Sequence, residues 1–256
     1  GSIPSADLSW ESTDQTDIGI DLGLFNHRVN FSADIYKKIT NGLLFSMPLP
    51  QYTGFGSYWT NLGEIENKGI EFELNGELVR GKDLTWSAGA NISFNKNTVN
   101  ELPNGTPILT TEATEVYYTV NATFMTREGL PIGQFYGLKW SGEVYPTDED
   151  AASHVTSIMG QAPVGGTLKY EDINGDGKID ANDREILGSP HPKLFGGFNT
   201  QVNWKNFDLN MQFSFVAGNM LFNQMRFLAS RGFAYDAARK ERKDAWSGPG
   251  HITTEH

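Results

Sequence analysis

The residues best suited to chemistry lie in one segment, 172–183, which is rich in Asp, Asn and Gly. Counted from Asp172, oxygen-bearing side chains stand at positions 1, 3, 5, 9 and 12, and position 7 offers its backbone carbonyl. Gly177, at position 6, permits the sharp bend that lets these oxygens converge. This spacing predicts a loop that binds Ca²⁺, a cation that prefers about six to eight oxygen ligands. The predicted ligands are Asp172, Asn174, Asp176, Lys178, Asp180 and Asp183.

This loop differs from an EF-hand loop in two respects. Position 12 is Asp183, which is shorter than the usual bidentate Glu, and the flanking residues do not predict long helices. The loop is similar to the calcium loops of dockerin modules, which also end in Asp, but it lacks their paired repeat. We expect Ile179 to anchor the loop. An Asp- and Gly-rich surface turn without a metal is the alternative interpretation.

Other arrangements of reactive residues receive no support from the sequence. The five histidines are widely spaced, the chain has no cysteine, and no serine lies in a nucleophile-elbow motif. Glu64, Glu66, Glu71 and Glu73 could supply paired carboxylates for glycoside hydrolysis, but Glu71 and Glu73 share one strand face, as ordinary polar residues of a strand do. We therefore expect that the protein is not an enzyme.

Composition narrows the class of protein further. The chain has 256 residues, 38% of them hydrophobic, which argues against disorder. With 31 acidic and 20 basic residues the net charge is -11, so nucleic acid is not an expected partner. No apolar run is long enough for a transmembrane helix. Strands of a β-barrel remain possible, since they alternate apolar and polar residues.

Alternation of this kind recurs along the chain and predicts antiparallel hairpins. Residues 84–95 are the clearest example, because every even position is apolar and every odd position is Gly, Asn, Ser or Thr. Short polar links join the predicted strands in pairs. The other predicted strands are residues 18–24, 29–35, 70–75, 198–204 and 207–215.

The connections between these hairpins are long. Residues 40–66, 96–130 and 141–193 show no clear alternation and are expected to be mostly irregular, and a short polar helix or ordered loop is expected at 234–246. Tight turns alternating with long loops are typical of an outer-membrane barrel, and the uncharged polar faces suit its interior. The alternative is a soluble β-rich carbohydrate-binding module whose apolar faces meet in one core.

Four stretches closely resemble the C-terminal barrel portion of the SusC/RagA-type TonB-linked outer-membrane transporters. They are NLGEIENKGIEFELNGEL (61–78), LTWSAGANISFNKNTVNEL (84–102), EGLPIGQFYGLKWSGEVY (128–145) and the run from GTLKYEDINGDGKID to FSFVAGN (166–219). The resemblance implies an all-β fold, in which an antiparallel meander with long external loops forms part of a large transmembrane β-barrel of about 22 strands. Residues 1–256 are then expected to form a partial barrel domain without plug or closing strands, with the calcium-type loop 172–183 inside it.

The same resemblance implies the function and the partners. Such transporters import glycans or oligopeptides across the bacterial outer membrane, draw energy from the TonB complex through their plug, and act with a SusD-like surface lipoprotein. A part of a barrel also has unpaired strand edges. We therefore expect the isolated 256-residue polypeptide to self-associate.

Overall fold

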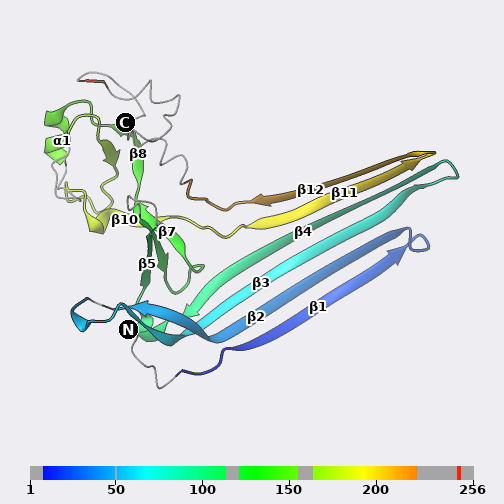
Figure 1. Ribbon diagram of the computed structural model, residues 1–256, viewed down its shortest axis with the longest axis horizontal. Coiled ribbons are helices and arrows are strands. Elements are labelled where there is room, and N and C mark those ends of the chain that lie inside the picture. The colour runs from blue at the N-terminus through cyan, green and yellow to red at the C-terminus, as the bar shows by residue number, and fades with distance from the viewer. Residues whose placement is uncertain (1–7, 50, 114–120, 155–163, 224–246, 249–256) are drawn as a thin grey trace. The chain divides into compact units, whose positions relative to one another are not determined.

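The computed structural model describes residues 8–49, 51–113, 121–154, 164–223 and 247–248 (Figure 1). The segment 234–246, for which a helix or ordered loop is expected, lies outside these residues. The chain divides into two compact units. The first comprises residues 1–110, 124–134 and 189–220, and the second comprises residues 111–123, 135–188 and 221–256.

A six-stranded antiparallel sheet dominates the first unit (Figure 1). Its strand order is β1-β2-β3-β4-β11-β12, so consecutive hairpins lie side by side and β11 joins the sheet through its pairing with β4. The strands are β1 (Ser12–Leu24), β2 (Val29–Pro48), β3 (Ser57–Arg80), β4 (Leu84–Glu101), β11 (Leu194–Trp204) and β12 (Phe207–Ala217). All six strands predicted from alternation are present, and the antiparallel meander is confirmed.

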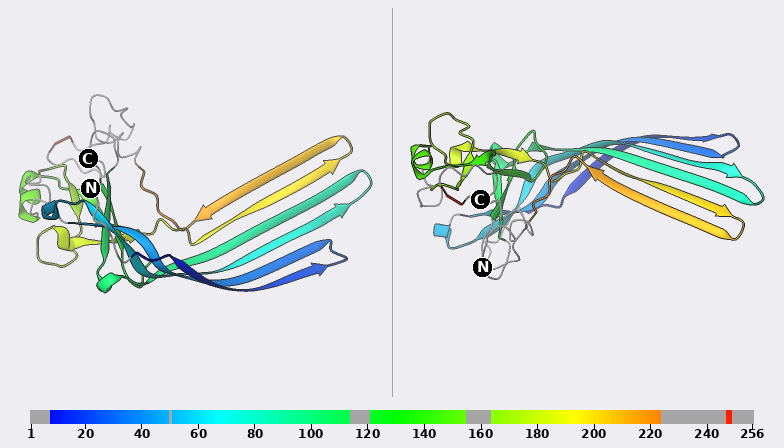
Figure 2. Two further views of the ribbon diagram at one scale, coloured as in Figure 1. Left: turned by 60° about the horizontal axis from the view of Figure 1, so that its bottom comes forward. Right: turned by 90° about the horizontal axis from the view of Figure 1, so that it is seen from above.

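Three tight turns lie at the same end of this sheet (Figure 2). They comprise residues 25–28, 81–83 and 205–206. The first turn has positive φ at Phe25, Asn26 and His27, and the last has positive φ at Lys205, which lets each chain reverse within a few residues. The short polar links of the sequence therefore become the hairpin turns.

The prediction of irregular structure at 40–66 is wrong. Strand β2 continues to Pro48 and β3 begins at Ser57, and their ladder runs to the pair Pro48 and Ser57, with the 3-10 helix η1 (Gln51–Thr53) between them. Backbone hydrogen bonds need no side-chain pattern, so strands can extend beyond the alternating segment. The prediction for 96–130 is also wrong in part, because β4 ends only at Glu101 and the strands β5 (Ile108–Ala113) and β6 (Asn121–Thr126) follow it.

A small hydrophobic core lies at the end of the sheet away from the tight turns. Ile65, Val99, Leu102 and Ile108 are buried there, and Leu43 and Ile132 pack against them. The 3-10 helix η2 (Pro103–Gly105) follows Leu102 directly. Backbone hydrogen bonds join Val99 to Leu130 and to Gly129, which holds the 124–134 segment against β4.

The remaining strands are short. The four-stranded sheet has the order β10-β7-β6-β5, and a two-stranded sheet pairs β8 with β9. These elements are β5 (Ile108–Ala113), β6 (Asn121–Thr126), β7 (Gln134–Leu138), β8 (Trp140–Val144), α1 (Asp148–His154), β9 (Leu168–Tyr170), η3 (Ala181–Asp183) and β10 (Arg184–Gly188). None of the helices in the described part of the chain has the length and apolar character needed to cross a membrane.

Candidate calcium loop and membrane face

One side of the six-stranded sheet, here called the apolar face, carries the apolar half of each alternating strand. Cross-strand register aligns these side chains in rows, because directly paired residues point to the same side of a sheet. One such row consists of Ile18, Ile35, Ile70, Phe94, Leu194 and Ala217. The apolar face is open: Ile18 is 73% exposed and Phe207 is 72% exposed.

The opposite side, here called the polar face, carries mainly amide, hydroxyl and glycine residues. One row across it consists of Asp21, Ser32, Glu73, Asn91, Gly197 and Ser214. Glu71 lies opposite Asp34, and Glu73 accepts a hydrogen bond of 2.5 Å from the Asn75 amide. Both glutamates therefore lie in a general polar surface, which agrees with their interpretation as ordinary polar residues.

The height of the apolar face can be calculated from β4. Its apolar positions run from Leu84 to Phe94, ten residue steps of about 3.3 Å, or about 33 Å along the strand. A strand tilted by about 40° would span about 25 Å, which is the height of the apolar band of an outer-membrane barrel. A soluble module would cover this face with a second apolar layer. Among the described residues no second apolar layer covers this face, which favours a barrel wall over a soluble module.

The second unit contains the predicted calcium loop between β9 and β10. Both oxygens of Asp172 accept backbone hydrogen bonds, from Gly175 at 2.7 Å and Gly177 at 2.8 Å. Gly177 has φ +79°, as the sharp bend at position 6 requires. Each Asp172 oxygen still has a lone pair for a further ligand. The start of the loop therefore has the turn that a calcium loop needs.

The end of the loop folds back onto its beginning through Asp183, which is fully buried. One Asp183 oxygen accepts a hydrogen bond from Ile173 at 3.0 Å and the other accepts one from Asp180 at 2.7 Å. These backbone donors, the Asp180 amide first, lower the pKa of Asp183 from its ordinary value, and the Asp172 carboxyl lies within hydrogen-bonding reach of it. Positions 1 and 12 of the loop are therefore adjacent.

The other predicted ligands turn their oxygens to the loop backbone. Asn174 accepts a hydrogen bond from the Asp176 amide at 2.9 Å, Asp176 accepts one from Lys178 at 2.9 Å, and the Asp180 carboxylate accepts one from Asn182 at 2.7 Å. Among the described residues, no group of three or more His, Asp or Glu side chains is placed so that it could hold a metal ion. Asp180 and Asp183 form a reciprocal capping box, in which the side chain of each accepts a hydrogen bond from the backbone of the other.

Packing fixes the loop to its own unit. Ile179 is buried, as expected for the residue that anchors the loop. A hollow of about 430 Å³ adjoins the loop and is lined by Tyr145 and Tyr170 among others. Nearby, Lys139 forms an ion pair with Glu171 at 2.8 Å. The oxygen-bearing residue types, the bend at Gly177 and the buried Ile179 suit a Ca²⁺ site. The side-chain oxygens of the described loop do not converge on one point.

Sequence reasoning missed one group of residues, the lysines Lys37, Lys68 and Lys96. They lie on three different strands, and only the register of those strands brings them into one row on the apolar face. Each lysine taken alone is an ordinary exposed residue, so no local motif marks them.

Comparison with known proteins shows the family. The sequence profile of the family described as "TonB dependent receptor-like, beta-barrel" matches residues 1–173. TonB-dependent receptor P3 of Formosa agariphila is 38% identical over 240 residues, which cover 94% of this chain and 23% of that protein. TonB-dependent receptor SusC of Bacteroides thetaiotaomicron is 29% identical over 219 residues, covering 84% of this chain and 20% of SusC.

The fold of this chain also matches solved structures of similar proteins. A structure of the RagAB peptide transporter matches 94% of this chain and 25% of the compared chain, with a TM-score of 0.70 and 26% identity. This chain thus spans about a quarter of the length of the proteins it matches. From its two-faced antiparallel sheet and these relatives, the chain belongs to the TonB-dependent receptor β-barrel family, in its SusC/RagA type, whose members are proteins of the bacterial outer membrane.

Proposed function

We propose that this chain forms part of the wall of an outer-membrane importer of glycans or oligopeptides, powered by TonB and served by a SusD-like surface lipoprotein. The observation that carries the proposal is the two-faced sheet. Its apolar face has the height of a membrane band, and its polar face carries mostly uncharged hydrogen-bonding groups. Relatives named SusC and RagAB peptide transporter support import as the function.

The chemistry of the polar face supports a polar, largely uncharged cargo. Amide and hydroxyl groups both donate and accept hydrogen bonds, as do sugar hydroxyls and peptide groups. Asn75 and Asn199, for example, lie close to Gly89 on either side. A Cβ atom added to Gly89 would lie only 3.0 Å from the side-chain nitrogen of Asn199. Such a surface would attract a hydrated oligomer without binding it tightly.

A binding experiment on the complete receptor tests this proposal. The receptor and the lipoprotein that purifies with it are titrated by calorimetry with neutral oligosaccharides and with oligopeptides of about five to ten residues. Saturable binding of one class, together with loss of uptake of that class from cells lacking the receptor, would support import. Unchanged uptake of both classes in those cells would contradict it.

We also propose that the loop 172–183 holds a structural Ca²⁺. The residues that would hold it are the side chains of Asp172, Asn174, Asp176, Asp180 and Asp183 and the carbonyl of Lys178. Bound calcium would supply a positive charge between carboxylates that otherwise repel one another. The adjacency of Asp172 and Asp183 and the positive φ of Gly177 support this proposal.

Calcium titration of the complete receptor by calorimetry tests the metal site, and hydrogen exchange of the peptide covering 172–183 gives a second readout. We expect one site with a Kd between about 1 µM and 1 mM, and slower exchange when calcium is present. The Asp176→Ala, Asp180→Ala variant should lose both effects. A matched Asp148→Ala variant, altered in the same unit but outside the loop, should keep them. The absence of calcium-dependent heat and protection in the unaltered protein would refute the site.

A further inference from the structure

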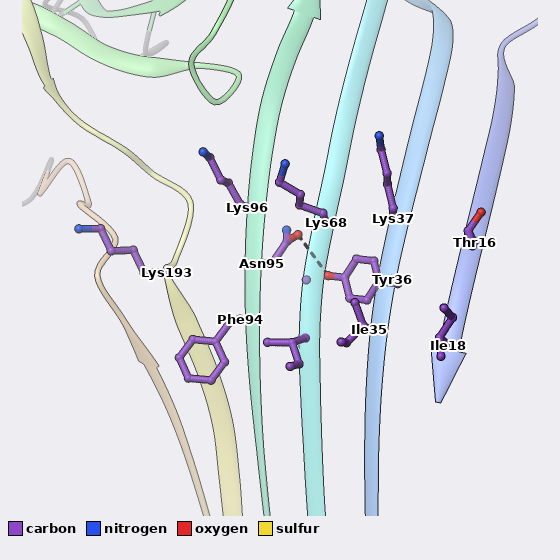
Figure 3. Close-up of a pocket in the computed structure, with 12 residues that line it drawn as sticks. Thr16, Ile18, Ile35, Tyr36, Lys37, Lys68, Phe94, Asn95, Lys96 and Lys193 are labelled. Atoms are coloured by element: carbon purple, nitrogen blue, oxygen red, sulfur yellow. Dashed lines mark hydrogen bonds between the residues drawn. The ribbon is translucent and has the colours of Figure 1, made fainter. Parts of the chain in front are cut away.

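Three lysines form a row across the apolar face, at the edge of its apolar band. Lys37 of β2 pairs with Lys68 of β3, and Lys68 pairs with Lys96 of β4, so all three point to the same side. Figure 3 shows their side chains running parallel, with the three amines directed away from the isoleucine and phenylalanine side chains below them. We call Lys37, Lys68 and Lys96 the lysine row.

Like charges directly opposite one another on a sheet destabilise it, so a row of three requires anions nearby. Glu66, one step further along the same face, supplies one: its carboxylate lies 3.0 Å from the Lys37 amine and 2.9 Å from that of Lys68. Both lysine side chains are still 54% exposed, whereas that of Glu66 is 11% exposed. Within the part of the chain that the structure describes, Lys96 pairs with no carboxylate. The lysine row therefore contains three ammonium groups, and the Glu66 carboxylate forms ion pairs with two of them.

Two other charged residues near the lysine row, Asp14 and Lys193, do not neutralise its positive charge. Asp14 lies on the same face of β1, opposite Ile39, and forms no ion pair with a described residue. Lys193 lines the same hollow, but Figure 3 shows its amine pointing away from the other three. The net charge of the row together with Glu66 is therefore positive.

A shallow hollow of about 580 Å³ adjoins the lysine row on its apolar side. Ile18, Ile35, Ile70 and Phe94 line it, and they form the last apolar row before the lysines. The lysines stand two residues beyond these side chains, which is about 5 Å in height for a tilted strand. A ligand placed here would meet hydrocarbon on one side and three amines on the other.

The row lies toward the sheet end that carries the long connections, away from the three tight turns. In outer-membrane barrels the long loops lie outside and the short turns face the periplasm, so the lysine row stands at the outer leaflet. Amines positioned just beyond an apolar band are suited to the phosphate groups of lipids.

We propose that the lysine row binds the phosphate of an outer-leaflet lipid headgroup, and that an acyl chain of that lipid lies in the apolar hollow beside it. The three amines supply the positive charge, and Glu66 holds two of them in place when the lipid is absent. This site is on the membrane side of the wall, so it is separate from the cargo path and does not depend on the identity of the cargo.

The test uses the complete barrel that carries this segment, purified in a neutral detergent and titrated with short-chain phosphatidic acid. Phosphatidylcholine of the same chain length tests the requirement for an exposed phosphate, and inorganic phosphate tests the requirement for a lipid. Native mass spectrometry counts the bound lipids. We expect phosphatidic acid to bind at least tenfold more tightly than either comparison ligand.

Variants distinguish a defined site from general positive charge. Lys68→Gln, Lys96→Gln should weaken phosphatidic acid binding at least tenfold. Lys38→Gln removes the neighbouring charge on the opposite face of β2, and Lys205→Gln removes a charge at the tight-turn end, so both should bind as the unaltered barrel does. Glu66→Gln should tighten binding about threefold or more, because it frees Lys37 and Lys68.

Three results would overturn the proposal. Equal affinity for phosphatidic acid and phosphatidylcholine would show that the three amines do not recognise an exposed phosphate. Equal affinity for inorganic phosphate would show that the hollow holds no acyl chain. Equal losses in the row variant and in Lys38→Gln would show that only total charge matters. Migration of each variant as a heat-modifiable folded barrel on a gel confirms that the comparison is made between folded proteins.

Discussion

Replacing Asp183 by Asn is expected to loosen the loop 172–183 even when calcium is absent. The buried Asp183 carboxylate accepts backbone hydrogen bonds on both oxygens, from Ile173 at 3.0 Å and from Asp180 at 2.7 Å. An asparagine keeps one acceptor oxygen, but its amino group is a donor. Whichever way the amide turns, one backbone N–H then faces another donor in a site closed to water.

The size of the effect follows from these contacts. A hydrogen bond to a charged acceptor contributes about 1.5–3 kcal/mol, and leaving a buried donor unpaired costs a similar amount. We therefore expect the local opening free energy of the loop to fall by about 2–3 kcal/mol. Since about 1.4 kcal/mol corresponds to a factor of ten, hydrogen-exchange protection of the Ile173 or Asp180 amide should fall about 30- to 150-fold.

Peptide-resolved hydrogen exchange on the complete barrel, in the presence of a chelator, measures this loss. Asp176→Asn is the matched control, because Asp176 is exposed and one of its oxygens accepts the Lys178 amide at 2.9 Å, a bond that asparagine can keep. The control should change protection less than threefold. Full protection in Asp183→Asn, or equal losses in both variants, would refute the argument that the buried carboxylate holds the loop closed.

The pKa of Asp183 is lowered from 3.8, so its contribution to loop stability should be complete above pH about 5 and decline progressively as the pH falls below about 4. Protection that is unchanged at pH 3 would contradict this. Phe213→Lys, on the apolar face, should lower the unfolding free energy of the barrel in lipid by about 2–4 kcal/mol. Gln212→Lys, on the polar face, should change it by less than about 1 kcal/mol. Urea titration measures both values. Tyr36→Phe removes the 3.1 Å hydrogen bond to Asn95 and should cost about 1 kcal/mol in the same titration. The isolated 256-residue polypeptide should self-associate through the edge strands β1 and β12, and a monodisperse monomer in light scattering would count against this.

Alternation predicted the strands wherever the two sheet faces differ in polarity. Residues 84–95 are apolar on one face and polar on the other, and they form most of β4. The pattern fails at 40–66, where β2 and β3 continue beyond the apolar band and Leu43 and Ile65 pack in the small core. There the backbone ladder extends the strands, and backbone hydrogen bonds leave no period in the sequence.

The segment 172–183 could be singled out as a candidate calcium loop because its oxygen-bearing residues follow one another along a short stretch of sequence. Spacing alone identified the bend at Gly177 and the anchor Ile179, both of which the structure contains. Spacing does not determine which way each side chain turns. Asp176 and Asp180 each accept a hydrogen bond from a nearby backbone N–H, and such local bonds compete with the convergence of side chains on a metal ion.

The lysine row illustrates why register must be known before a site on a sheet can be recognised. Near the tight turn, Arg80 pairs with Thr85, and a regular ladder continued from that pair would place Lys68 opposite Asn97. A bulge between Glu77 and Val79 shifts the register by one residue, so that Lys68 lies opposite Lys96 instead. A shift of one residue exchanges the two faces of a strand relative to its partner. The extra residue Leu78 therefore determines whether three lysines share the membrane side of the wall, although it lies far from them along β3.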